Sequence, residues 1–230
     1  MLVFKRILFS LLLIGTAASS AFSQAARSPF SSFGIGEYYG NSLAHNQGMA
    51  GVGISNPQYY YLNNKNPALL VYNRLTVFEG GMLMEQRTAK GDSSKEVNSN
   101  GNLNYLIMGF PVKPGKWTTS AGLMPYSSVN FVLSYQNDIA GSTNTVDVTE
   151  KGSGGINQFF WSNGVALNKN LSVGLKATYL FSSIINETTN SLTNTTQQVS
   201  YFPTIYERSY VRDLDFSLGI SYHKDSLTKK

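Results

Sequence analysis

The sequence contains no cysteine, only two histidines and few charged residues. Of 230 residues, 13% are charged, and the formal net charge is +5. Without cysteine there is no disulfide scaffold and no thiolate metal site. His45 and His223 lie in no metal-ligand spacing and at no spacing that fits a catalytic triad. We therefore expect no enzyme, no catalytic residue, no cofactor and no metal. Basic residues form no cluster, so no nucleic-acid partner is expected.

Long hydrophobic runs are also missing, apart from one at the amino terminus. Lys5 and Arg6 precede the apolar stretch 7–18, and small residues follow it. That stretch is shorter than the roughly 20 residues that a spanning helix needs. The pattern predicts a secretory signal peptide over 1–23, with a retained anchor helix as the alternative. Any membrane crossing farther along the chain would have to be made by strands.

What the sequence does have is alternating hydrophobicity. In 171–182 and 214–223, apolar side chains alternate with mostly polar ones. Because successive side chains of a strand face opposite sides, each segment has one apolar and one polar face. Tight turns are predicted after strands two and four, and long polar loops after strands one, three and five, as in outer-membrane barrels. The six predicted strands are 75–87, 102–112, 117–136, 156–167, 171–186 and 210–223.

The predicted fold is all-β: an antiparallel transmembrane β-barrel with an N-terminal plug. Residues 24–74 combine glycine and proline with many aromatic side chains, so we expect a folded plug, with a flexible tail as the alternative. Residues 75–230 would supply six strands of a larger, incomplete barrel, because the smallest barrels need about eight. The expected location is the outer membrane of a Gram-negative bacterium, in contact with its lipid. A soluble β-sandwich is the competing fold.

Strand three contains Pro125, which cannot donate a hydrogen bond to a neighbouring strand. Its odd-numbered positions from Trp117 to Tyr135 are expected to share the outward face, with no register shift at the proline. One interpretation is a bulge or kink that opens the wall. The other is a turn between two short strands, since the residues after the proline are turn-like.

The predicted inward faces are polar. Glu79, Glu85, Lys176 and Asp215 are expected to point into the interior, which suits a hydrated channel at least as well as an apolar one. Lys176 could meet a substrate carboxylate. Pairing with Asp215 on the neighbouring strand is the simpler expectation.

Five motifs stand out beyond these patterns: SPFSSFGIGEYYG, NQGMAGVGISNP, NPALL, MGFPV and GLMPYSSVNF. From about residue 29 to the end, the chain resembles the FadL-like family of outer-membrane transporters for long-chain fatty acids and aromatic hydrocarbons, in its Bacteroidetes version. The resemblance implies a barrel of roughly fourteen strands, of which this chain would be an N-terminal fragment. It also implies a hatch in the lumen and a kinked third strand that opens sideways into the membrane.

The resemblance also implies a function and its residues. The function is passive transport of hydrophobic small molecules, fatty-acid-like or aromatic. The alternative is a barrel similar to the shuttle of type IX secretion, which binds secreted protein cargo. The lateral opening would be formed by Pro125, Tyr126, Ser127 and Ser128. The hatch that the substrate passes would be formed by Gly48, Met49, Ala50, Gly51, Gly53, Asn66, Pro67 and Ala68.

Overall fold

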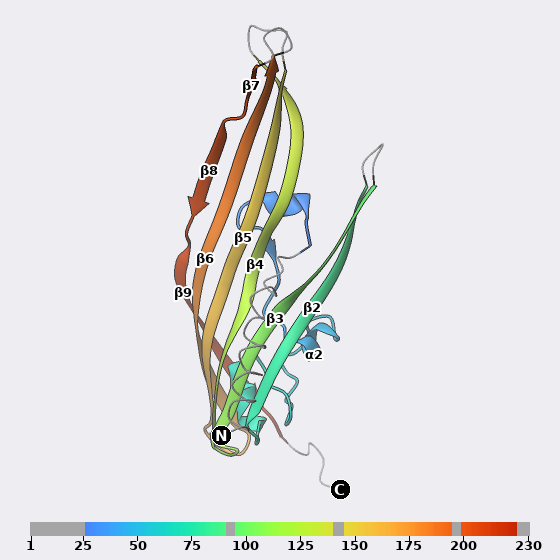
Figure 1. The fold of residues 1–230 in the computed structure, drawn as a ribbon. Helices are drawn as coiled ribbons and strands as arrows, with labels where there is room; N and C mark the ends of the chain where they lie inside the picture. Colours follow the sequence, from blue (N-terminus) through green and yellow to red (C-terminus); the bar gives the residue numbers. More distant parts are fainter. Residues whose placement is uncertain (1–25, 91–94, 140–144, 195–198, 225–230) are drawn as a thin grey trace, which may run out of the picture.

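The structure, a computed structural model, describes residues 26–90, 95–139, 145–194 and 199–224 and is dominated by a long antiparallel sheet (Figure 1). The predicted signal peptide, 1–23, lies outside the described residues and stays a prediction. Helical structure comprises η1 (Pro29–Ser32), α2 (Ala44–Gln47) and η2 (Pro67–Tyr72). No helix within the described ranges is long and apolar enough to cross a membrane. The strands are β1 (Glu37–Tyr38), β2 (Val77–Lys90), β3 (Lys95–Lys113), β4 (Trp117–Asp138), β5 (Thr145–Ala166), β6 (Leu171–Asn194), β7 (Val199–Tyr201), β8 (Thr204–Ser209) and β9 (Arg212–Tyr222).

From β2 to β7, strands that follow one another in the chain pair with one another in the sheet. The order is β2-β3-β4-β5-β6-β7; β1 pairs with β4, and both β8 and β9 pair with β6. All pairings are antiparallel, as short connections between strands allow. The all-β antiparallel prediction is confirmed. Over the described residues the sheet is open, with β2 at one edge and β9 at the other, and does not close into a barrel.

Strands β4, β5 and β6 reach farther than the sequence predicted. They have 22, 22 and 24 residues. The segments 137–155 and 187–209, predicted as long loops, contain the first half of β5, the ends of β4 and β6, and β7 and β8. These extensions consist largely of Ser, Thr, Asn and Gly, so hydrophobicity does not alternate there and the period-two signal is lost.

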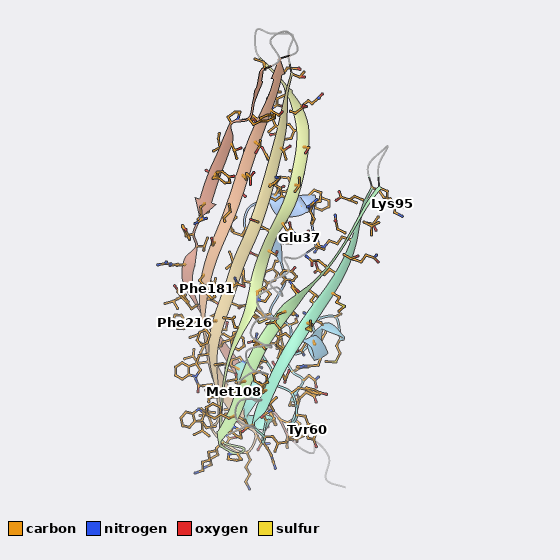
Figure 2. The ribbon with its side chains drawn as sticks, viewed as in Figure 1. Glu37, Tyr60, Lys95, Met108, Phe181 and Phe216 are labelled. Atoms are coloured by element: carbon orange, nitrogen blue, oxygen red, sulfur yellow. The ribbon has the colours of Figure 1, made fainter. Side chains whose placement is uncertain are left out.

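The two faces of the sheet differ in what they contact. Residues 26–73, here called the N-terminal segment, pack against one face, which we call the covered face. The opposite, uncovered face carries exposed apolar side chains along every long strand (Figure 2). They include Phe78, Met82 and Met84 on β2, Met108 and Phe110 on β3, Trp117 and Leu123 on β4, Phe159 and Trp161 on β5, Leu175 and Tyr179 on β6, and Leu214, Phe216, Leu218, Ile220 and Tyr222 on β9.

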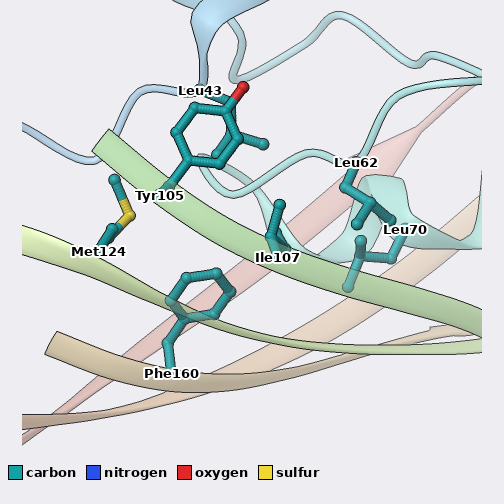
Figure 3. Close-up of a cluster of buried hydrophobic side chains, with 7 residues drawn as sticks. All are labelled: Leu43, Leu62, Leu70, Tyr105, Ile107, Met124 and Phe160. Atoms are coloured by element: carbon teal, nitrogen blue, oxygen red, sulfur yellow. The ribbon is translucent and has the colours of Figure 1, made fainter. Parts of the chain in front are cut away.

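The main hydrophobic core lies between the N-terminal segment and the covered face (Figure 3). Each buried leucine contributes roughly 1.5–3 kcal/mol by leaving water, so the segment is attached by apolar packing as well as by polar contacts. Its members are Leu43, Leu62 and Leu70 of the segment and Tyr105, Ile107, Met124 and Phe160 of β3, β4 and β5.

The register of β4 changes at Pro125. This residue pairs with Asn157, whereas Ser127 pairs with Ile156, so Tyr126 is an extra residue. Met124 is buried before this point, and Ser127, Val129 and Phe131 are buried after it. The expectation of one outward parity was therefore wrong, because a β-bulge turns the following side chains to the other face. A turn between two separate strands is also not what forms, since β4 continues through the bulge.

Candidate functional site: the split between β3 and β4

Strands β3 and β4 pair along only part of their length. Their pairing runs from Leu106 and Leu123 down to the turn at Lys113. Beyond it, the described part of β3 pairs with β2, and β4 pairs with β5 and the short β1. Figure 1 shows the β2–β3 hairpin leaning away from β4. Register shifts also occur between Gly81 and Met82 of β2 and at Pro125, and such bulges bend strands and end pairing.

A cavity of about 450 Å³ lies at the base of this split. Leu103, Leu106 and Leu123 line it from the strands beside the split, and Phe181 lines it from β6. No lining residue carries a formal charge. Of the four residues predicted to form a lateral opening, Pro125, Ser127 and Ser128 line this cavity. Tyr126 instead packs edge-on against Tyr38, with 5.0 Å between ring centroids. A cavity of this size and polarity suits a small apolar ligand.

Residues 28–39, which we call the strap, take the place of β3 beside the upper part of β4. The Ser28 amide donates to the carbonyl of Asn130 at 2.9 Å, and the Tyr39 amide donates to the carbonyl of Tyr126 at 3.0 Å. The Ser127 hydroxyl donates to the carbonyl of Ile35 at 2.6 Å. The strap therefore satisfies backbone groups that β3 leaves without a strand partner.

Gly36 allows the strap to lie this close to β4. Its φ is +85°, in the left-handed region that glycine tolerates. A Cβ at this position would overlap the backbone of Ser128 and would lie 2.7 Å from Cγ2 of Val129. No other residue fits here without displacing the strap.

An ion pair joins the strap to the β2–β3 hairpin. The Arg87 guanidinium on β2 pairs with the Glu37 carboxylate and lies 3.4 Å from the Glu85 carboxylate. The Ser28 hydroxyl donates to Oε1 of Glu37 at 2.6 Å. Tyr39 ends the strap at the cavity wall, where burial, together with the nearby Glu85 charge, raises the pKa of its phenol. The strap thus bridges the two sides of the split.

The predicted hatch residues fall into two groups, and neither lines this cavity. Gly48 to Gly53 follow α2 in a turn in which Ala50 and Gly51 have positive φ values of +55° and +81°. Met49 is exposed, while the carbonyl of Gly53 accepts a hydrogen bond from the Asn63 side chain at 2.7 Å. The second group, Asn66, Pro67 and Ala68, is buried at the start of η2.

The start of η2 sits on a row of glycines. Gly164, Gly174 and Gly219 are cross-strand partners on β5, β6 and β9. A Cβ at any of them would overlap Pro67 or Asn66. Asn66 caps η2 by accepting from the Ala68 amide at 3.0 Å, and its own amide group donates to the carbonyl of Ile220 on β9 at 3.2 Å. The sequence showed each of these glycines, but only the register brings them together.

The two polar residues predicted for the interior lie in different environments. Lys176 is buried, and its ammonium donates to the carbonyl of Asn64 at 3.1 Å and lies 3.4 Å from the Asn64 side-chain oxygen. Asp215 is exposed opposite Thr178. The structure therefore places Asn64, and not Asp215, at the ammonium. Asn64 was missed because a contact between residues 112 apart leaves no local sequence signal.

Comparison with known families matches residues 3–230 to the BamG family. No curated protein and no solved structure matches the chain. The assignment to FadL-like transporters was therefore wrong. The motifs behind it are short glycine, asparagine and proline patterns. In this chain NPALL forms the cap and first turn of η2, and such local chemistry does not discriminate between families. With its β-rich fold, the match indicates an outer-membrane-associated protein. The chain belongs to the BamG family.

Proposed function

We propose that this chain is a membrane-embedded, non-catalytic subunit that works with the BAM complex in the outer membrane. Its family is related to that complex. The observation that carries the proposal is the uncovered face, where exposed apolar side chains follow one another on all the long strands. Exposure of so large an apolar surface to water is unfavourable. Contact with lipid or with another apolar surface removes this cost.

The length of the strands supports partial immersion. A strand crosses the hydrocarbon layer with about 9–11 residues, whereas β4, β5 and β6 have 22, 22 and 24. Exposed apolar residues of β5 are found from Phe159 to Val165, next to the short turn, and the other half of β5 exposes none. We infer that the half of each strand near the short turns spans the membrane as barrel wall, and that the polar half projects beyond it.

The covered face supports a plug. The N-terminal segment buries Leu43, Leu62 and Leu70 there and places Asn64 against Lys176. A face filled by the chain's own segment leaves less room for a wide aqueous channel. We therefore favour a scaffold or docking role over the role of an open pore.

The cavity at the split favours a second candidate function, the binding and sideways passage of a hydrophobic small molecule. Its lining is uncharged and includes Leu103, Leu106, Leu123 and Phe181. Hiding apolar ligand surface there would contribute about 25 cal/mol per Å². Binding of secreted protein cargo stays a prediction, since no contact in the described residues bears on it.

Isolation of the tagged protein from mildly solubilised outer membranes tests the first proposal. The BAM complex should co-isolate in stoichiometric amount. A membrane-integrated protein that comes out alone, without the complex, would contradict it. The second candidate is tested separately, with an apolar fluorophore in detergent-solubilised protein. Leu106→Gln and Leu123→Gln should weaken saturable binding about tenfold or more, whereas Leu175→Gln, on the same face but outside the cavity, should not.

A further inference from the structure

Exposed cations without acidic neighbours gather at one end of the sheet. Five exposed cations lie at the end with the short turns, which we call the turn end. They come from four different parts of the chain: Arg74 precedes β2, Lys113 and Lys116 flank the β3–β4 turn, Lys169 lies in the β5–β6 turn, and Lys224 follows β9. Backbone hydrogen bonds tie these parts together, from Ala166 to Lys116 at 2.8 Å and from His223 to Asn170 at 2.8 Å.

Among the residues that the structure describes, no Asp or Glu lies at the turn end. The nearest one along β2 is Glu79, on the covered face, which accepts a hydrogen bond from the Leu62 amide at 2.8 Å. Asp225 lies outside the described residues. The four ion-pair contacts of the described chain, Arg27–Glu96, Arg87–Glu37, Arg87–Glu85 and Lys151–Glu187, all lie toward the opposite end. The turn end therefore presents cations that the described chain does not neutralise.

Three of these cations lie next to exposed apolar residues at the ends of strands. Lys113 follows Val112, Lys116 precedes Trp117, and Lys224 follows Tyr222 by two residues. Val112, Trp117 and Tyr222 are all exposed on the uncovered side of the wall. Tryptophan and tyrosine favour the boundary between hydrocarbon and headgroups. A cation just beyond that boundary lies at the depth of lipid phosphates.

A small cavity lies at the same end, between the N-terminal segment and the covered face. It has a volume of about 190 Å³ and is lined by Arg74, Lys169 and the backbone around Gly115, among others. The Arg74 guanidinium lies 5.9 Å from the ring centre of Tyr59, which also lines the cavity. Because this cavity faces away from the lipid side of the wall, the cations that meet lipid headgroups are those beside Val112, Trp117 and Tyr222.

We propose that the turn end binds the phosphate headgroups of anionic phospholipids in the adjacent leaflet, with Lys113, Lys116 and Lys224 next to the exposed apolar residues and Lys169 in the neighbouring turn. Phosphatidylglycerol should accumulate around this end in preference to zwitterionic lipid. Because both kinds of lipid share the phosphate, the preference comes from net charge and falls with added salt.

The chain's own tryptophans provide the probe. It has two, Trp117 beside Lys116 and Trp161, so Trp161→Phe leaves a reporter at the turn end. The full chain would be reconstituted in vesicles containing brominated phosphatidylglycerol or brominated phosphatidylcholine, and quenching of Trp117 would be compared. We expect phosphatidylglycerol to be enriched about fivefold or more around Trp117. The attraction between a single interfacial cation and an anionic lipid surface corresponds to about this factor.

Removal of cations tests whether the lipid enrichment comes from the turn end or from the net charge of the whole protein. Combined Lys113→Gln, Lys116→Gln and Lys169→Gln should bring the enrichment close to one. Lys90→Gln with Lys95→Gln, at the opposite end, should leave it unchanged. Equal quenching by both lipids in the parent protein would overturn the proposal, as would enrichment that survives the triple substitution. If the parent protein shows no lipid preference and the triple variant loses BAM co-isolation, the turn end binds an acidic protein partner instead.

Discussion

The Lys176 ammonium of β6 donates to the main-chain carbonyl of Asn64 at 3.1 Å, which fixes the N-terminal segment to the covered face. Lys176→Ala removes the donor and leaves a buried carbonyl without its partner. We expect a loss of about 1–3 kcal/mol in the free energy of unfolding. Asn64→Ala keeps the main-chain acceptor and should cost less. Denaturant unfolding in detergent checks this order, and equal losses would contradict it.

The glycine row predicts a sharp difference between two glycine-to-alanine substitutions. In Gly174→Ala the new methyl group overlaps the backbone of Pro67 and Ala68, whereas in Gly101→Ala it meets nothing closer than 3.7 Å. The first should displace η2 and cost roughly 1–3 kcal/mol, as overpacking does. The second should be close to neutral. Protease cleavage within 54–73 should accelerate only in Gly174→Ala, and resistance equal to that of the parent would refute the close approach.

The strap predicts controlled access to the cavity at the split. Tyr38 and Ser127 are cross-strand partners, so cysteines at both positions lie within disulfide range. In a chain without other cysteines, oxidation should lock the strap and slow entry of an apolar fluorophore, and reduction should restore it. Identical entry rates before and after reduction would show that the strap does not limit access.

The ion pair between Glu37 and Arg87 should contribute modestly to holding the strap in place at the cavity. Both side chains are about 30% exposed, and pairs of that kind contribute about 0.2–1 kcal/mol. Glu37→Gln should therefore accelerate fluorophore entry by less than about tenfold. The exchange Glu37→Arg with Arg87→Glu should recover part of the parent rate. Fluorophore entry that is faster in the exchange variant than in Glu37→Arg alone or Arg87→Glu alone would argue against a direct pair.

His45 predicts a dependence of stability on pH. It stacks on Tyr61 with 5.1 Å between ring centroids, and burial lowers its pKa. The unfolded chain then binds the proton more readily than the folded one, so the stabilising difference is complete above the ordinary pKa of about 6.5 and is lost as pH falls through the lowered value. His45→Gln should flatten the decrease in unfolding midpoint between pH 7.5 and 5. An unchanged slope would contradict the assignment.

Sequence patterns were most informative where one face of a strand is apolar. Leu214 to Tyr222 alternate strictly, and the structure places them on one strand with the apolar residues on the uncovered face. The pattern failed in the polar extensions, where neither face is apolar. It also failed at Pro125, because a bulge of one residue is set by pairing with β5 and not by the residues themselves.

The candidate site was only partly accessible from sequence. Pro125 pointed to the right part of β4, because a residue that cannot donate a ladder hydrogen bond marks a break in pairing. The strap, Asn64 and the glycine row could not be found this way. Each depends on contacts between distant parts of the chain, such as those of Asn66 with Ile220 and of Ser28 with Asn130.

The central claim is that the uncovered face contacts lipid, and spin labels along β5 test it most directly. Single cysteines at Phe159, Trp161 and Val165 on the uncovered face, and at Gln158, Phe160 and Ser162 on the covered face, would be labelled in the reconstituted full chain. The account predicts that labels on the uncovered face collide with oxygen, which concentrates in lipid, and are shielded from a water-soluble nickel complex, in alternation with those on the covered face. Equal, high access of the nickel complex to Phe159, Trp161 and Val165 would contradict it.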